Sequence, residues 1–428
     1  MAQQLYFSRD SKMFIEFDGV VWEVPVLDGF SFSQATNSTE ITLNEMESTA
    51  GVSRRGRRAF NDSLAPGEWS FSTYVRPFKS STTGTGKADS AAEVHAVEEV
   101  LWALYAGAKN YDATSFDYDT GGTNVITPGT SSSTINLGSS NSSTLGTANV
   151  YFVLGSDNRK VMKLKDVTVN EASVDFDIDG ISTINWSGSA SEVLDFTGST
   201  HEDNTAPVHS DTTQDGGTIA IGDVWLDAND SYRLYVLTNV TNGSEARTAY
   251  IDEAILATNN FIRNRLTVLS VTPTTRDPDS DGANELEANY SLTLTGGNVT
   301  FTNNISYITP EELGIVNVPI GHVTGTRSVS GSFTCYLTED TSATNASADF
   351  FDDVRAITNV VTNSFALVFK IGGASGTPRL ELNMPTCHIE IPTHSVEDVI
   401  SLETNFMALP TTIAGTDEAT IIYHGAVV

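Results

Sequence analysis

The sequence has few basic residues, few cysteines and no long apolar run. Only 23 of its 428 residues are Lys or Arg, against 54 Asp or Glu, which gives a formal net charge of -31. Proteins that hold nucleic acid place Lys and Arg against the phosphates, so this balance excludes tight DNA binding. No stretch has the length of a membrane span, and the first 20 residues lack the apolar core of a signal peptide. We therefore expect a soluble chain, folded in a cytosol, that contacts no membrane.

The two cysteines, Cys335 and Cys387, are too few for a disulfide framework, and a cytosol would keep them reduced. We expect both to be inert strand residues. A metal site at Cys387, His388 and His394 is disfavoured, because adjacent residues of a strand point to opposite faces. The sequence has no nucleophile elbow, phosphate-binding glycine loop or metal-protease motif, so no catalytic residue and no cofactor are predicted.

Ser, Thr, Asn and Gly are abundant, and apolar residues alternate with them. Residues 69–75 and 329–337 each place aromatic or aliphatic side chains on one face and Ser or Thr on the other, the pattern of a half-buried strand. The sequence therefore predicts a mainly β fold.

The strand patterns repeat along the chain. A glycine-led strand at residues 26–34 corresponds to residues 294–303, and the strand at residues 69–75 corresponds to residues 329–337. Later strands at residues 167–188 correspond to residues 387–408. This order predicts two copies of one module, strand–strand–helix–strands, each a sandwich-like or barrel-contributing sheet flanked by one helix.

One helix is predicted in each module. Ser90 and Glu93 resemble a capping box before an apolar stripe, which Gly107 ends. Ser347 and Asp349 suit the start of the second helix. The two stripes consist of Val94, Val97, Leu101 and Tyr105, and of Phe350, Val354, Ile357 and Val361.

Two further segments have no counterpart in the repeat. Residues 109–149 are rich in Gly, Ser, Thr and Asn, and residues 198–255 contain one hairpin pattern near residues 232–237. Both are predicted as long surface loops. The predicted division is a first module at 1–197, a linker or insertion at 198–255 and a second module at 256–428.

Several segments resemble the duplicated, trimer-forming tail tube proteins of long-tailed siphophages. In the first module these are residues 33–45 (SQATNSTEITLNE), 58–64 (RAFNDSL) and 68–74 (EWSFSTY). In the second module they are residues 303–310 (NNISYITP) and 318–321 (VPIG). The resemblance extends over both modules and is weakest in the two insertions.

The resemblance implies a structural virion protein. Trimeric, pseudo-hexameric rings would stack into a hollow tube around a tape-measure protein, between tail terminator and distal tail proteins. The tube would be assembled in the host cytoplasm, and DNA would later pass through it without tight binding. Some relatives carry an immunoglobulin-like domain at the C-terminus, which we do not expect after Val428.

An acidic, hydroxyl-rich lumen would keep DNA from sticking. Carboxylates recur on the predicted strands of both modules, and they either face such a lumen or belong to an ordinary solvated face. The candidates are Glu171, Asp175, Asp177, Asp179, Glu390, Glu397 and Glu403.

One basic cluster, Arg54, Arg55, Arg57 and Arg58, stands out in the acidic chain. It is either a nucleic-acid patch, a solvated loop or an interface. The family resemblance favours an interface in which these arginines pair with acidic residues of a neighbouring ring, for which Glu311 and Glu312 are available.

Asp277, Asp279 and Asp281 match the opening of a calcium loop, but Ala288 stands where the loop needs its last Glu. The tip of a hairpin is the favoured interpretation.

Two other functions fit a β-rich chain. An adhesin or glycan-binding protein would carry a secretion signal and would form no rings, and a glycoside hydrolase would place two carboxylates across a cleft. Ring formation separates the tube protein from both.

Overall fold

The fold is taken from a computed structural model. It describes residues 5–42, 57–80, 92–113, 115–137, 143–208, 219–241, 245–251, 260–277, 281–284, 286–313, 315–339, 345–356, 365–373, 378–413 and 415–425.

Strands dominate the chain, and most belong to one large sheet, so the predicted mainly β fold is confirmed. Eight strands form the central row of this sheet. In order of pairing they are β3 (Ser31–Thr42), β4 (Arg57–Tyr74), β13 (Thr183–Ala190), β12 (Lys160–Asp177), β21 (Leu294–Thr302), β24 (Ser328–Tyr336), β28 (Ile400–Ala408) and β26 (Arg379–Ile389).

The same order of pairing occurs twice in this row. The four strands β3–β4–β13–β12 pair in the same order as β21–β24–β28–β26. In each set the first strand in sequence pairs with the second, and the fourth strand in sequence lies between the second and the third. Equivalent residues occupy equivalent places, since Asn185 lies opposite Ser72 and Asn405 lies opposite Ser332. The division at residues 197 and 255 stays a prediction.

Further strands extend the central row in each half. They are β1 (Lys12–Phe17), β2 (Val20–Glu23), β11 (Ala148–Leu154), β14 (Glu192–Asp195) and β19 (Ala249–Ile251) in the first half, and β20 (Val268–Pro273), β25 (Phe365–Ile371), β27 (Thr393–Val396) and β29 (Thr420–His424) in the second. β14 and β29 again take matching places, because each pairs with the first residues of the long strand, β12 or β26.

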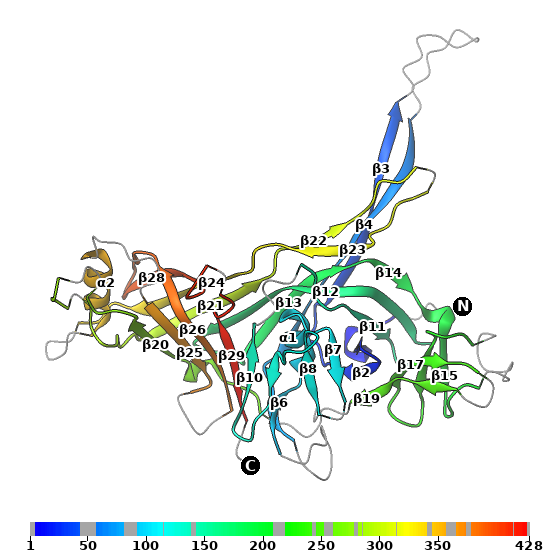
Figure 1. Cartoon of the computed structure of the whole chain (residues 1–428), viewed down its shortest axis with the longest axis horizontal. Helices are drawn as coiled ribbons and strands as arrows, with labels where there is room; N and C mark the ends of the chain where they lie inside the picture. Colours follow the sequence, from blue (N-terminus) through cyan, green and yellow to red (C-terminus); the bar gives the residue numbers. More distant parts are fainter. Residues whose placement is uncertain are drawn as a thin grey trace, which may run out of the picture.

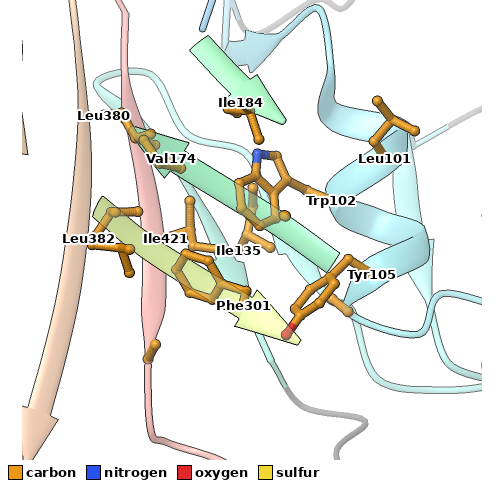
Figure 2. Packing of buried hydrophobic residues seen from close by; sticks show 14 of the residues in the cluster. Leu101, Trp102, Tyr105, Ile135, Val174, Ile184, Phe301, Leu380, Leu382 and Ile421 are labelled. Atoms are coloured by element: carbon orange, nitrogen blue, oxygen red, sulfur yellow. The ribbon is translucent and has the colours of Figure 1, made fainter. Parts of the chain in front are cut away.

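The core lies under the apolar face of this sheet and is continuous between the two halves. Trp102 is at its centre, with its ring 4.8 Å from that of Trp186 and 5.5 Å from that of Phe301. Figure 2 shows Trp102 and Phe301 beside Val174 and Ile421, which come from strands of different halves. The halves are therefore held together by packing as well as by strand pairing.

The first helix is shorter than predicted. It is α1 (Glu99–Tyr105), and residues 94–96 form strand β6 (Val94–Ala96) against β5 (Pro77–Lys79) instead of a first helical turn. Every residue of α1 is buried, so it has no solvent face. The predicted stripe was wrong at Val94, because strand pairing overrides helical periodicity there. It was also wrong at Val97, which lies in the turn before α1. Ser90 lies outside the described residues.

The second helix, α2 (Ser347–Ala356), lies where it was predicted, with Phe350 and Val354 buried. The Ser347 hydroxyl bonds to the preceding strand, donating to the Tyr336 carbonyl at 2.8 Å. The Asp349 carboxylate accepts a hydrogen bond from the Ala346 amide at 2.9 Å. Ile357 and Val361 lie outside the described residues. No described helix has both the length and the apolarity to cross a membrane.

The segment at residues 109–149 was predicted as a surface loop, and the structure corrects this. It forms β7 (Asn110–Asp112), β8 (Asp117–Asp119), β9 (Ile126–Thr127) and β10 (Ser132–Asn136). Tyr118, Ile126 and Ile135 are fully buried in the main core. β10 also pairs with β29, so the insertion links the two halves. The Ser- and Thr-rich composition concealed a few apolar residues at buried positions.

The segment at residues 198–255 is likewise structured and is not only a loop. β15 (Thr200–Asp203), β16 (Val224–Asp227), β17 (Arg233–Asn239) and β18 (Ala246–Arg247) form a small separate sheet. The predicted hairpin is confirmed by the antiparallel pairing of β16 and β17. Short 3₁₀ turns occur at Ser8–Asp10, Thr197–Ser199 and Asn264–Leu266.

A buried polar network joins the start of α1 to the C-terminal strand. The Tyr423 hydroxyl donates to Glu98 Oε1 at 2.7 Å and accepts from Trp102 Nε1 at 2.8 Å. Burial raises the pKa of the Glu98 carboxyl to about 7. This acid is therefore protonated in the folded chain at pH values where the unfolded chain would ionise it.

We expect Glu98→Gln to remove one component of the pH dependence of stability. A group whose pKa is raised on folding stabilises fully below its unfolded pKa, near 4.5, and this contribution is lost as pH rises to about 7. The free energy of unfolding of the natural chain should therefore fall by about 3 kcal/mol relative to the variant over that range. Denaturant titrations at both pH values measure the difference, with exposed Glu68→Gln as control. Identical pH profiles for natural chain and Glu98→Gln would contradict the prediction.

Candidate assembly surfaces

The two halves meet edge to edge through β12 and β21. The register is antiparallel from Glu171 opposite Thr302 to Asp177 opposite Gly296. The Ser173 and Thr300 hydroxyls lie 3.1 Å apart across it. We call this pairing the internal junction. It joins the long strand of the first half to the first strand of the second half.

The strands in the two corresponding end positions are unpaired on one side. β3 has the place in the first half that β21 has in the second, and within the described residues it pairs only with β4. β27 follows β26 along the same side of β28, and so it has the place in the second half that the end of β12 has in the first. In the described part of the chain β27 pairs only with β28. We call β3 the leading edge and β27 the trailing edge. An unpaired edge has free backbone N–H and C=O groups and is a template for another strand.

Apolar side chains are more exposed at the two unpaired edges than at the internal junction. At the internal junction Val174, Phe176, Val299 and Phe301 are all buried to at least 96%, with exposed fractions of 0%, 4%, 0% and 0%. On the leading edge Phe30 and Phe32 are only partly buried. Beside the trailing edge Ile391 and Val396 are 57% and 75% exposed. Both edges therefore have apolar surface that the internal junction covers.

One face of the central row is mostly polar in both halves, with Tyr336 and Met407 as exposed exceptions, and we call it the polar face. Ser, Thr and Asn alternate there with buried residues, and residues 31–37, 67–74, 168–177, 183–190, 294–302, 328–336 and 400–408 contain no Lys or Arg. Two similar hollows lie on it, one in each half. One is lined by Ser31, Ser70 and Ser187, and the other by Thr300, Ser330 and Asn405.

Most of the predicted acidic candidates lie on the polar face. Their neighbours Ala172, Val174 and Phe176 are buried, so the acidic side chains of β12 point the other way. The residues on this face are Glu171, Asp175, Asp177, Glu390 and Glu403, together with Glu68, which the sequence reasoning missed. Asp179 and Glu397 instead lie in the turns that follow β12 and β27, where strand alternation has ended. Glu68 was detectable from its place in the alternating strand at residues 68–74.

Neighbouring amides hold two carboxylates of the polar face, Asp175 and Glu390, in place. Asn185 Nδ2 donates to Asp175 Oδ2 at 2.6 Å and accepts at Oδ1 from the Ser72 hydroxyl at 2.6 Å. In the second half Asn405 Nδ2 donates to Glu390 Oε2 at 3.0 Å. These bonds hold the acidic groups along the sheet instead of leaving them as flexible arms.

β3 and β4 extend beyond the body as a two-stranded arm, which Figure 1 shows in blue. Of the predicted basic cluster, Arg57 and Arg58 lie on this arm and are exposed, and Arg57 Nε is 3.2 Å from Glu40 Oε1 of the same arm. Arg54 and Arg55 lie outside the described residues. The arm thus presents at least part of the cluster at one end of the sheet.

The second half has a shorter hairpin in the same place between its first two strands. It consists of β22 (Ile305–Ile308) and β23 (Gly321–Thr324) with the described residues between them, and we call residues 305–313 and 315–324 the apical loop. It lies beside the root of the arm (Figure 1), where the Asn317 carbonyl accepts from the Leu64 amide at 2.8 Å. Glu311 and Glu312 therefore lie at the same end of the molecule as the arginines.

The described residues of the calcium-loop pattern are hydrogen-bonded to one another. The Asp277 carboxylate accepts hydrogen bonds from the amides of Asp281 and Gly282 at 3.1 and 3.0 Å, which agrees with the hairpin-tip interpretation. Asp279 lies outside the described residues. In the described ranges no three His, Cys, Asp or Glu side chains are grouped to hold a metal ion.

The cysteines and histidines lie as predicted. Cys335 and Cys387 are free and buried, and burial raises the pKa of their thiols to about 11 and about 12. His388 is exposed on the face opposite Cys387. His394 is exposed and packs edge-on against the Phe351 ring at 4.5 Å.

No family model matches the chain. It is 27% identical over 402 residues to the tail tube protein pb6 of Escherichia phage T5, and the match covers 92% of this chain and 69% of that protein. The resemblance to siphophage tail tube proteins, seen in short segments of the sequence, is therefore confirmed over nearly the whole length.

Proposed function

We propose that this protein is a structural component of a phage tail, which polymerises as stacked trimeric rings into the tail tube. One observation carries the proposal. The chain contains its own example of the contact that would close a ring, in the internal junction between β12 and β21. The two unpaired edges are the corresponding strands at the two ends of the row.

Pairing the trailing edge of one copy with the leading edge of the next would repeat the internal junction between chains. Such a contact is heterologous, because the two surfaces differ, and it generates a ring when the rotation closes. Closure removes exposed strand edges, which otherwise favour aggregation. The similarity to pb6, a tail tube protein, supports this assignment.

In the ring the polar face would line the lumen. Its carboxylates and hydroxyls, with no Lys or Arg among them, would repel phosphate and offer DNA no counterion-releasing contact. The lumen would hold a tape-measure protein during assembly and let DNA pass at ejection. Tail terminator and distal tail proteins would bind the two ends.

The arm would reach the neighbouring ring. Arg54, Arg55, Arg57 and Arg58 lie at or near its tip in the sequence, where bidentate pairs with acidic residues would fix the register between rings. No enzymatic step is needed for any of these roles.

Negative-stain electron microscopy of the purified chain tests the proposal. We expect rings with three-fold symmetry at low concentration and hollow tubes at high concentration. A sample that stays monomeric at both low and high concentration would contradict the proposal. Rings with the polar face on their outer surface would contradict it as well.

A further inference from the structure

We propose that the apical loop docks on the opposite end of a second copy of this chain, at the turn formed by residues 260–267. This contact would join one ring to the next along the tube axis. It rests on the proposed function and adds a stacking surface separate from the arm. We call residues 260–267 the basal turn.

The apical loop is apolar and exposed to an unusual degree. Its exposed aliphatic side chains, with their exposed fractions, are Ile308 46%, Leu313 104%, Ile315 62%, Val316 51%, Ile320 71% and Val323 42%. A soluble protein rarely leaves so many neighbouring aliphatic side chains in water unless a partner covers them.

The loop is held rigidly, so its exposure is not that of an unanchored segment. The Tyr307 hydroxyl donates to the Asp166 carbonyl, and His322 Nε2 accepts from the Leu145 amide at 3.0 Å. Asn317 Nδ2 and Oδ1 bond to the backbone of Glu312 at 3.2 and 3.1 Å. The inward side chains are thus fixed to the first half while the outward ones face solvent, which lowers the entropy cost of docking.

The basal turn lies at the other end of the same strands. The apical loop follows Thr302, whereas the turn packs beside Gly180, whose carbonyl accepts from the Asn264 amide at 3.2 Å. The register pairs Thr302 with Glu171 and Gly296 with Asp177, so about 20 Å of strand separates the two ends. A contact between opposite ends of two copies repeats without closing and builds a rod.

The basal turn is also apolar. Phe261 and Leu266 are 41% and 50% exposed, and the adjoining Ile178 and Ile181 are 41% and 42% exposed. The Phe261 ring packs edge-on against Tyr74 at 5.3 Å, so this surface is fixed as well. Two matching apolar surfaces at opposite ends fit axial stacking.

A small cavity of about 180 Å³ opens beside the turn, between Ile178, Arg265 and Leu294. Asn264 lines it and is only 6% exposed, yet its Oδ1 has no hydrogen-bond partner among the described residues. A buried acceptor without a donor destabilises the free chain. A backbone N–H from the docked loop would satisfy it.

The charges of the two surfaces are complementary. Glu311 and Glu312 precede Leu313 on the apical loop, and exposed Arg263 and Arg265 flank Asn264 on the basal turn. None of these four charges forms a salt bridge within the described residues of the chain. Complementary charges set the register of an interface and exclude wrong partners.

A charge-swap experiment on the full chain tests the contact. The three variants are Glu311→Arg with Glu312→Arg, Arg263→Glu with Arg265→Glu, and all four together. We expect each double variant to form normal rings whose median stack length falls at least about tenfold. Because the mean length of an open stack varies as the square root of the association constant, this corresponds to an about hundredfold weaker association between rings. The fourfold variant should recover long tubes, because the same pairs form with exchanged signs.

Leu313→Asp provides a second test that does not depend on charge pairing, since this side chain is fully exposed and its replacement disturbs no packing. It should also give rings without stacks. Tubes of natural length from Leu313→Asp and from both double variants would overturn this inference while leaving the rings intact. Absence of rings from the natural chain would overturn the proposed function itself, and this inference with it.

Discussion

Replacing Ile391 and Val396 together by aspartate is expected to leave the chain folded and to stop it from closing rings. Both side chains lie beside the trailing edge and are 57% and 75% exposed, so their replacement removes little existing packing. At the internal junction the corresponding strand is buried on its apolar side by β21, with Val174 at 0% exposure. Ring closure would bury the new carboxylates in the same way.

The cost of that burial sets the size of the effect. An unpaired charge moved out of water costs at least about 2 kcal/mol, and usually more. Each contact would then weaken by roughly 30-fold or more, and every contact in the ring carries the same change. Size-exclusion chromatography with light scattering should therefore detect monomers at concentrations where the natural chain forms rings.

Ile221→Asp is the matched control for this double variant. Ile221 is 67% exposed, close to the exposure of Val396. It lies three residues before β16 of the small separate sheet, which Figure 1 places at the other side of the molecule from β28. The control should form rings normally. Rings of natural stability from the aspartate double variant would mean that the trailing edge is not the ring contact.

Trp102→Ala should produce the largest loss of stability of any single substitution considered. Trp102 is fully buried and touches aromatic rings from β13 and β21, that is, from both halves of the chain. Removing a buried tryptophan side chain costs about 3 to 5 kcal/mol through lost packing and the cavity that remains. The Tyr423 hydroxyl also loses the donor that now lies 2.8 Å away.

Trp102→Phe separates the two contributions to this loss. It keeps an aromatic ring in the core and removes only the indole N–H and part of the volume, so we expect a cost nearer to about 1 to 2 kcal/mol. Denaturant unfolding followed by circular dichroism measures both variants. Equal losses for Ala and Phe would place the effect in the hydrogen bond, and a loss below about 1 kcal/mol for Ala would contradict the role of Trp102 as the centre of the core.

The amino-acid sequence by itself determined the class of fold and the repeat. Alternation of apolar and polar residues is a local property. It correctly predicted strand structure over residues 69–74 and 329–336, although β4 begins earlier, at Arg57, and it placed the carboxylates of β12 on one face. The second helix was equally predictable from the sequence, because it has an apolar buried side and a polar side that faces solvent. The segments around Ser33 and Asn303 carried the resemblance that the match to pb6 confirms.

Tertiary structure alone decided the features that depend on distant residues. Val94 begins a strand instead of a helix because Lys79 lies opposite it, and the Ser-rich insertion enters the core because β10 finds β29 almost 300 residues later. Which strand edges remain unpaired, and that the apical loop and basal turn lie at opposite ends, likewise follow from pairing across the chain. Side-chain alternation repeats every two residues, so a short stretch of sequence determines it. Which strand pairs with which depends on the free energy of contacts between residues far apart in the sequence, and no short pattern determines that.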